Sequence, residues 1–148
     1  MKTLHQFTEE YKGPINWTAP NSEEEHDEVQ YQLDGHKNHP LPDWVHKRLT
    51  QLSDKNEWAR AIKRGKSKNF SRQDVRNTNN TGDSWANSNS DARKRARAPT
   101  LYGPNKKVQR PIYLRNPETG ETHLISGHHR STYVTDVLHR PVSVHVIE

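Results

Sequence analysis

The chain has 148 residues, enough for about one ordinary domain, but only 28% of them are hydrophobic and 28% are charged. Because so polar a chain buries little apolar surface, we expect a small core and a good part of the chain without regular structure. There is no cysteine, which excludes disulfides, thiolate zinc sites and thiol chemistry. No apolar run is long enough for a membrane span or a signal-peptide core, so we expect an intracellular protein without a membrane partner.

The charge is unevenly distributed along the chain. Residues 1–57 hold 6 Lys and Arg against 11 Asp and Glu, whereas residues 58–148 hold 17 against 7. Between Arg60 and Arg110 there are 14 basic residues and 3 acidic ones. A stretch this basic attracts polyanions, so nucleic acid, and DNA first, is the expected partner. The alternative is a solvated basic linker that has no ligand.

Residues 1–65 form a helical N-terminal region in our prediction. Leu4, Phe7 and Tyr11 lie on one face of a short helix over 1–12, which Gly13 and the following proline end.

Three further helices are predicted in this region. NSEEEHDEVQYQLDG begins with a capping residue, Asn21 or Ser22, carries acidic residues in its first turn, and ends at Gly35. LPDWVHKRLTQL has an apolar stripe, and SDKNEWARAIKRGK repeats the pattern, with Ser53 or Asp54 as its cap and a glycine as its end. We expect these last two helices to pack on each other.

Residues 66–100 have almost no apolar periodicity and are rich in Asn, Ser, Thr and Asp before they turn basic. This composition predicts a flexible, disordered polar and basic linker that becomes ordered on a polyanion. The predicted nucleic-acid-binding residues are the cations in and after this linker: Arg93, Lys94, Arg95, Arg97, Lys106, Lys107 and Arg110.

Residues 101–148 carry the clearest pattern of regular structure. RPIYLRN and THLIS read as two strands joined by the turn PETGE, and they predict a hairpin. Apolar residues at helical spacing follow, and RPVSVHVIE alternates valines as a closing strand. The predicted order is therefore β, β, α, β, an α+β fold.

The stretch ISGHHRSTYV joins the second strand to the helix and carries the candidate site. A glycine without a Cβ lets an anion approach, and the first amides of a helix have no partner within it. Histidines add donors that are partly charged near neutral pH, and arginine offers a planar fork for phosphate oxygens. We predict a phosphate-binding turn made of Ser126, Gly127, His128, His129 and Arg130.

The alternative for this turn is purely structural. Gly127 then only permits the turn, and His129 or Arg130 pairs locally, for instance with Asp136 or the C-terminal carboxylate. No metal site is predicted, because the ten histidines are scattered and lack the spacing of metal ligands.

The segment RPIYLRNPETGETHLISGHHRSTYVTDVLHRPVSVHVIE resembles the core of the ParB/sulfiredoxin superfamily, in its Arg-Pro-Ile strand, hairpin, G-x-H-R signature, helix and closing strand. The resemblance covers roughly the last third of the chain and implies a small mixed β-sheet. It also implies that Gly127, His129 and Arg130 bind the phosphates of a nucleotide or a nucleic acid, with His128 in the same pocket.

The residues at the turn narrow the choice of subfamily. Sulfiredoxins need a cysteine where His128 stands, so their activity is excluded. The paired histidines resemble the G-H-H-R of the nuclease-like and serine-kinase-like branches. The resemblance to the first implies a ParB-like nuclease with His128, His129 and Arg130 as catalytic residues.

Two other functions stay open. A non-catalytic protein would bind DNA or inhibit a host protein through the basic arm and the helices. A kinase of the serine-kinase-like branch would use a nucleoside triphosphate with Mg²⁺ and would need a carboxylate base, for which Glu118 and Glu121 lie nearby in sequence.

The first ten residues, MKTLHQFTEE, resemble the leader that targets internal proteins into the heads of T-even-type bacteriophages. The resemblance implies a phage-encoded protein that acts in the cytoplasm of a bacterial host or is packaged in the capsid. The alternative is an ordinary N-terminal helix.

Overall fold

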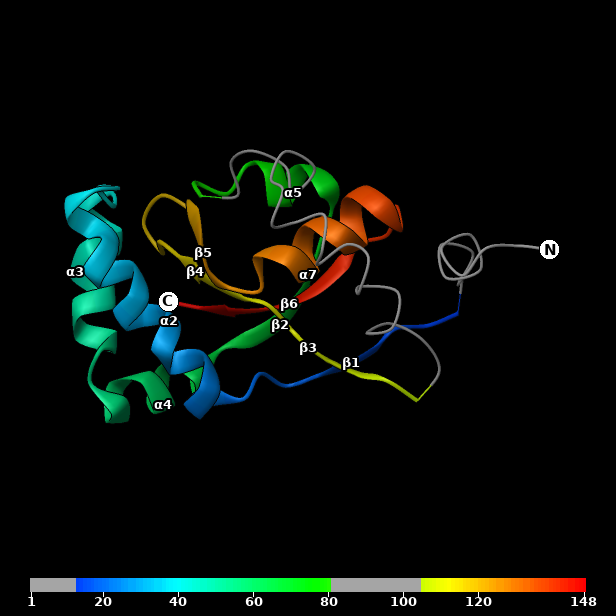
Figure 1. Cartoon of the computed structure of the whole chain (residues 1–148), viewed down its shortest axis with the longest axis horizontal. Helices are drawn as coiled ribbons and strands as arrows, with labels where there is room; N and C mark the ends of the chain where they lie inside the picture. Colours follow the sequence, from blue (N-terminus) through cyan, green and yellow to red (C-terminus); the bar gives the residue numbers. More distant parts are fainter. Residues whose placement is uncertain (1–12, 81–104) are drawn as a thin grey trace.

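The computed structural model describes residues 13–80 and 105–148 and shows an α+β fold built on a four-stranded sheet (Figure 1). The strand order is β2-β6-β4-β5, so β2 and β5 are the edge strands. β4 pairs with β5 antiparallel and with β6 parallel, and β2 pairs with β6 antiparallel. These strands are β2 (Lys66–Phe70), β4 (Ile112–Arg115), β5 (Thr122–Ser126) and β6 (Val142–Ile147).

The sequence pattern accounts for three of these strands. The predicted hairpin is present as β4 and β5, and the closing strand is β6. Val142, Val144 and Val146 are all buried on one face of β6, as their alternation predicts.

One face of the sheet is covered by α2 (Ser22–Asp34), α3 (Asp43–Leu52) and α4 (Lys55–Arg64), which lie together at one end of the molecule in Figure 1. Local capping sets the start of α2 and of α4. Asn21 accepts hydrogen bonds from the first amides of α2, Asp54 does the same for α4, and Gly65 follows the last residue of α4. These three helices confirm the predicted ones.

The helices and the sheet share one core. Val29, Leu49 and Trp58 from the helices pack against Ile112 and Ile147 from the sheet. The predicted N-terminal region and the predicted C-terminal domain are therefore joined by a common hydrophobic cluster, worth about 1.5–3 kcal/mol for each large buried side chain.

The opposite face is covered by α5 (Arg72–Arg76), α7 (His128–Thr132) and the π-helical turn η4 (Tyr133–Val137). Phe70, Tyr113, Tyr133 and Val134 are buried in this second core. The helix expected after the glycine is thus an α-helical turn that widens into a π-helical one, a distortion often found beside functional sites.

The prediction of a disordered linker over 66–100 is wrong for its first part, residues 66–76. Residues 66–70 form β2 and residues 72–76 form α5. Each has a single buried apolar residue, Phe70 and Val75, and is held by contacts with distant parts of the chain, so no periodicity marks it. The remainder of the predicted linker, 81–100, and the predicted helix over 1–12 lie outside the described residues.

A second small sheet pairs β1 (Asn16–Thr18) with β3 (Lys107–Gln109) in parallel. Figure 1 shows this pair at the end of the molecule away from α3 and α4. It brings Gln109 beside the start of α2, where its side chain accepts a hydrogen bond from the amide of Asn21. Among the described residues, no helix is both long and apolar enough to cross a membrane.

Candidate functional site

The chain turns sharply at Gly127, between β5 and α7. Gly127 has φ 96° and ψ 30°, a left-handed conformation that favours glycine. A Cβ at this position would lie 2.6 Å from the Cβ of Pro111. The backbone thus needs glycine here for its conformation and for the close approach of a neighbour.

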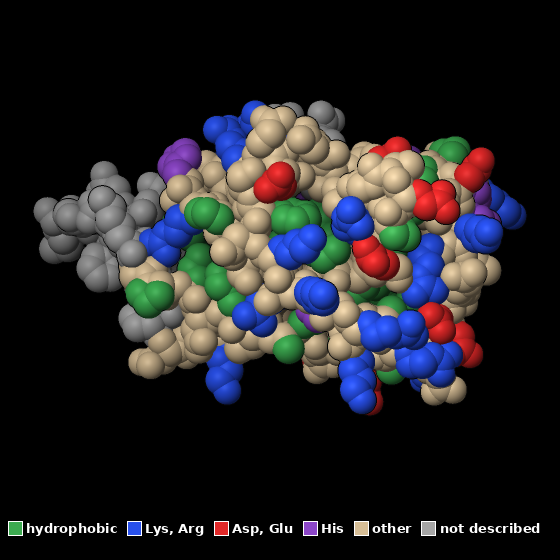
Figure 2. Space-filling model, turned by 180° about the vertical axis from the view of Figure 1, so that it is seen from behind, with side chains coloured by type: hydrophobic (Ala, Val, Ile, Leu, Met, Phe, Trp, Pro, Cys, Tyr) green, Lys and Arg blue, Asp and Glu red, His purple; other side chains and the backbone are tan. Residues whose placement is uncertain are grey.

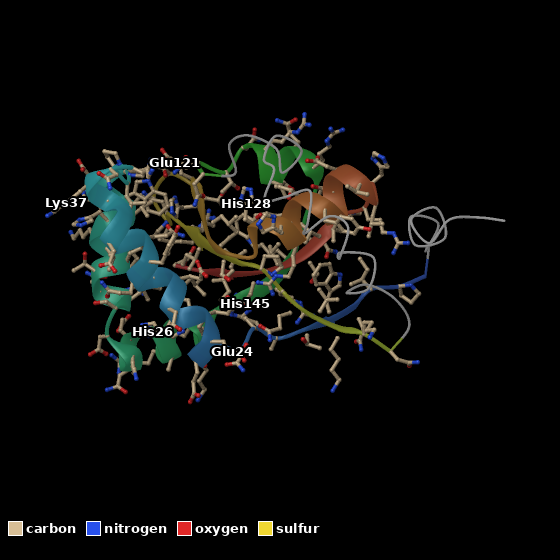
Figure 3. The ribbon with its side chains drawn as sticks, viewed as in Figure 1. Glu24, His26, Lys37, Glu121, His128 and His145 are labelled. Carbon is tan, nitrogen blue, oxygen red and sulfur yellow. The ribbon has the colours of Figure 1, made fainter. Side chains whose placement is uncertain are left out.

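This turn forms part of a groove with a volume of about 1230 Å³. All five residues of the predicted turn, 126–130, line it, together with α2, the segment 38–42 and residues 79–80. Figure 3 shows His128 at the start of α7, in the region between the helices and the strands. The residues predicted as one site therefore face one cavity.

Arg130 is held by contacts from two distant parts of the chain. Its Nη2 pairs with Oε1 of Glu25 at 3.2 Å, and its Nη1 donates to the carbonyl oxygen of Gln109 at 2.9 Å. The side chains of Arg130 and Glu25 are 22% and 14% exposed. The hydroxyl of Ser126 donates to the second oxygen of the same glutamate. The guanidinium is thus fixed in orientation beside a carboxylate from α2.

The local partners considered from the sequence for this arginine are wrong. Asp136 pairs instead with Arg72 at 3.0 Å, and the main-chain oxygen of Glu148 accepts hydrogen bonds from Arg48 at 2.8 and 3.0 Å. Glu25, which the sequence analysis missed, lies 105 residues away from Arg130. No local pattern could have indicated it, because acidic residues in the first turn of a helix are explained by the helix dipole alone.

The paired histidines lie side by side on the groove. The rings of His128 and His129 are 5.5 Å apart between centroids and 86° to each other, an edge-to-face arrangement. Both residues are half-buried and both line the cavity. Two imidazoles can therefore reach a ligand bound in the groove.

His123 forms the buried wall of the groove and is 1% exposed. Its Nε2 lies 2.7 Å from Oε1 of Gln32 and 3.3 Å from Nδ2 of Asn80. Burial lowers the pKa of this imidazole from its ordinary 6.5 to about 4, so the ring is neutral at neutral pH. Within the described part of the chain, its Nδ1 has no hydrogen-bond partner.

Amide side chains complete this wall. Asn80 donates to the carbonyl oxygen of Leu124 and accepts from its amide, both at 2.7 Å, as a neighbouring strand would. Gln32 donates to the carbonyl oxygens of Leu124 and Ile125, each at 3.0 Å. These bonds satisfy the edge of β5 and keep the cavity wall rigid.

The groove carries charges of both signs. Glu25, Glu28 and Asp34 line it from α2, and Arg130 and the two histidines line it from the turn and α7. Among the described residues, no cluster of three or more His, Asp or Glu can hold a metal ion. Mg²⁺, however, is commonly held by one or two carboxylates together with the phosphates of a substrate, and Glu25 lies beside the predicted phosphate-binding turn.

Glu121, one of the two carboxylates considered from the sequence as a catalytic base, does not lie at the predicted phosphate-binding turn. Glu121 accepts a hydrogen bond from the indole of Trp44 at 3.1 Å. Figure 3 shows it close to α3, at the other end of β5 from His128. The structure thus brings Glu25 to the predicted phosphate-binding turn and places Glu121 away from that turn.

The predicted nucleic-acid-binding residues fall into two groups. Lys106 and Lys107 are exposed at the start of β3, whereas Arg110 is half-buried and its Nε donates to the hydroxyl of Ser143 at 2.9 Å. The other predicted contacts, Arg93, Lys94, Arg95 and Arg97, lie outside the described residues. Figure 2 shows further Lys and Arg side chains spread over the back of the molecule, with acidic ones among them toward the right.

Comparison of the chain with protein-family models, with curated proteins and with solved structures finds no match.

Proposed function

We propose that the groove binds the phosphate groups of a nucleic acid and that the protein is a nuclease of the ParB-like kind. The observation that carries the proposal is that residues 126–130 line one large cavity, with two histidines and an arginine fixed by Glu25. The resemblance of the C-terminal segment to the ParB/sulfiredoxin superfamily supports it.

The residues have separate tasks in this proposal. One histidine of the pair takes a proton from the attacking water, and the other gives a proton to the oxygen that leaves the phosphorus. Arg130 donates to the phosphoryl oxygens, where negative charge increases in the transition state. Glu25 keeps the guanidinium oriented and, with a phosphate bound, is also near enough to help hold Mg²⁺.

Cleavage of labelled single- and double-stranded DNA and RNA tests the proposal. We expect His129→Ala and Arg130→Ala to lower the cleavage rate by at least about 100-fold, since a general acid or base contributes about 10²–10⁴. Arg130→Lys keeps the ion pair with Glu25 but loses the planar fork, and it separates loss of chemistry from loss of fold.

Arg76→Ala is the matched control for charge. Arg76 is 56% exposed, and its Nη2 lies 4.0 Å from Oδ1 of Asp136. This variant should cleave at the wild-type rate. Wild-type rates in both His129→Ala and Arg130→Lys, with circular dichroism showing a folded protein, would contradict the nuclease proposal.

The acidic side chains of the groove favour a second candidate, a kinase that binds a nucleoside triphosphate with Mg²⁺. Glu25, Glu28 and Asp34 repel a bare phosphate backbone but suit a metal-bound nucleotide. The cavity, about 1230 Å³, is ample for such a ligand. A thermal-shift screen with ATP, CTP and GTP distinguishes the two, because a rise in melting temperature that needs Mg²⁺ favours the kinase.

A further inference from the structure

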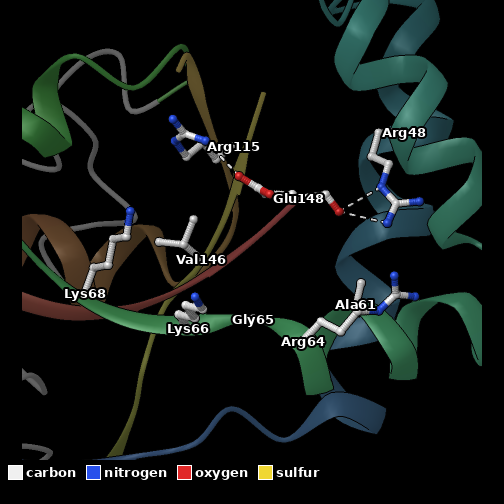
Figure 4. A pocket seen from close by; sticks show the side chains of 9 residues that line it. All are labelled: Arg48, Ala61, Arg64, Gly65, Lys66, Lys68, Arg115, Val146 and Glu148. Carbon is white, nitrogen blue, oxygen red and sulfur yellow. Dashed lines mark hydrogen bonds and ion pairs between the residues drawn. The ribbon is translucent and has the colours of Figure 1, made fainter. Parts of the chain in front are cut away.

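A second cavity, with a volume of about 300 Å³, lies beside the edge strand β2, across the sheet from the groove. Figure 4 shows the side chains that line it, which come from α3, α4, β2, β4, β6 and the residue after β6. Its charged lining is Arg48, Arg64, Lys66, Lys68, Arg115 and Glu148. We call these six residues the basic pocket.

Three cations of the basic pocket are open to solvent. Arg64, Lys66 and Lys68 are exposed, and no ion pair joins them to an acidic group within the described residues. Lys66 and Lys68 are two residues apart on β2 and so point to the same face of the sheet, about 6.6 Å from each other along the strand. Val146 and Arg115 lie on the same face, so the two lysines lie beside an arginine.

The other two cations, Arg48 and Arg115, already contact Glu148. Arg115 Nη1 pairs with Oε2 of Glu148 at 2.7 Å, and Arg48 donates to the carbonyl oxygen of the same residue at 2.8 and 3.0 Å (Figure 4). The Glu148 side chain is 54% exposed, and Arg48 also pairs with Glu57 at 3.1 Å. A single acidic side chain thus lies among five cationic ones.

We infer that the basic pocket is a second binding site for the phosphate backbone of a nucleic acid, which meets Lys66, Lys68 and Arg64 directly and competes with Glu148 for Arg115. The inference shares its ligand with the proposed function but does not depend on cleavage in the groove.

Two observations favour a nucleic acid backbone as the occupant. Lys66 and Lys68 follow an extended edge strand. Their spacing of about 6.6 Å is about twice the 3.4 Å or so between charges along the axis of one nucleic acid chain, so the two lysines can contact two phosphates of the same chain. The part of the chain from residue 58 onward also has 17 basic residues against 7 acidic ones, a balance that attracts such a polyanion over several ångströms.

The test compares two double variants with the same change in charge. Lys66→Gln with Lys68→Gln neutralises the pocket, and Lys47→Gln with Lys55→Gln neutralises two exposed lysines outside it. Fluorescence anisotropy with a labelled duplex, at several salt concentrations, measures affinity. We expect the pocket variant to bind roughly tenfold more weakly than the control and the slope of log K against log salt to fall by about two.

A third variant should have the opposite effect. Glu148→Gln removes the side-chain carboxylate that competes for Arg115 and keeps the size of the side chain. It should tighten binding by roughly twofold to fivefold, the upper part of the range for one exposed ion pair. A merely structural role for Glu148 predicts no gain.

The inference is overturned if the pocket variant binds within twofold of the control, or if Glu148→Gln weakens binding. It is also overturned if the wild type binds no duplex, or if only inorganic phosphate or free nucleotides bind the pocket. Arg130→Lys, measured in parallel, reports on the groove. If this variant loses cleavage but still binds duplex at the basic pocket, the two sites are separate.

Discussion

Gly127 determines how the chain leaves β5 and therefore where His128, His129 and Arg130 lie. Two independent features require glycine at this position: its φ of 96° and the short distance to Pro111. The sequence motif predicted the turn correctly, because a glycine between a strand pattern and a helix pattern is a strong local signal. It could not predict that Pro111 packs against that glycine.

Replacing Gly127 with alanine should destabilise the protein by about 2–5 kcal/mol. The left-handed conformation costs about 1–2 kcal/mol for a residue with a Cβ, and overpacking adds about 1–3 kcal/mol. Gly35→Ala is the control, because a methyl group on Gly35 would have no neighbouring atom within 4 Å and the φ of this residue is −78°. Urea unfolding should show the control within about 0.5 kcal/mol of the wild type, or slightly more stable. Equal losses in the two variants would contradict this account of the turn.

At the scale of the element, prediction succeeded where the signals are local. Asn21, Asp54 and Gly65 mark the ends of α2 and α4 within a few residues of sequence, and the structure places the ends there. β2 and α5 have no such periodic signal. Lys66–Phe70 is a strand because it pairs with β6 over five residues, a contact with a segment more than 70 residues away.

The one local signal in α5 is its capping box, which the sequence analysis did not use. Ser71 Oγ accepts from the amide of Asp74 at 3.1 Å, and Asp74 accepts from the amide of Ser71 at 2.9 Å. Ser71→Ala should lower the free energy of unfolding by about 1 kcal/mol. Ser67→Ala, at an exposed position on β2, should change it by less than about 0.5 kcal/mol. Chemical denaturation of both variants checks this, and an unchanged Ser71→Ala protein would show that the cap contributes nothing.

The whole molecule has two candidate sites at opposite edges of one sheet. The groove lies along β5 and the basic pocket lies along β2, and the shared core of α2, α3 and α4 links the two. The set of residues that meets at each site could not be predicted from the sequence. Glu25 reaches Arg130, and Arg48 reaches Glu148, only because the helical layer packs on the sheet.

The same packing buries His123, and this makes stability depend on pH. In the folded protein the pKa of this ring is about 4, whereas in the unfolded chain it returns to its ordinary 6.5. Between these values the unfolded chain binds a proton that the folded protein does not. The stability from His123 is therefore complete above pH 6.5 and is lost as the pH falls from 6.5 toward 4.

Urea unfolding at pH 7 and at pH 5 measures this loss. The wild type should lose about 2 kcal/mol more than His123→Gln between the two pH values, because the other ionisable groups are common to both proteins. The imidazole resonance of His123 should also stay unshifted in the folded wild type from pH 7 to pH 5. If wild type and variant lose stability equally, or if this resonance titrates near pH 6.5, then His123 is not buried in the wall of the groove and the groove is more open to water than its hydrogen bonds to Gln32 and Asn80 indicate.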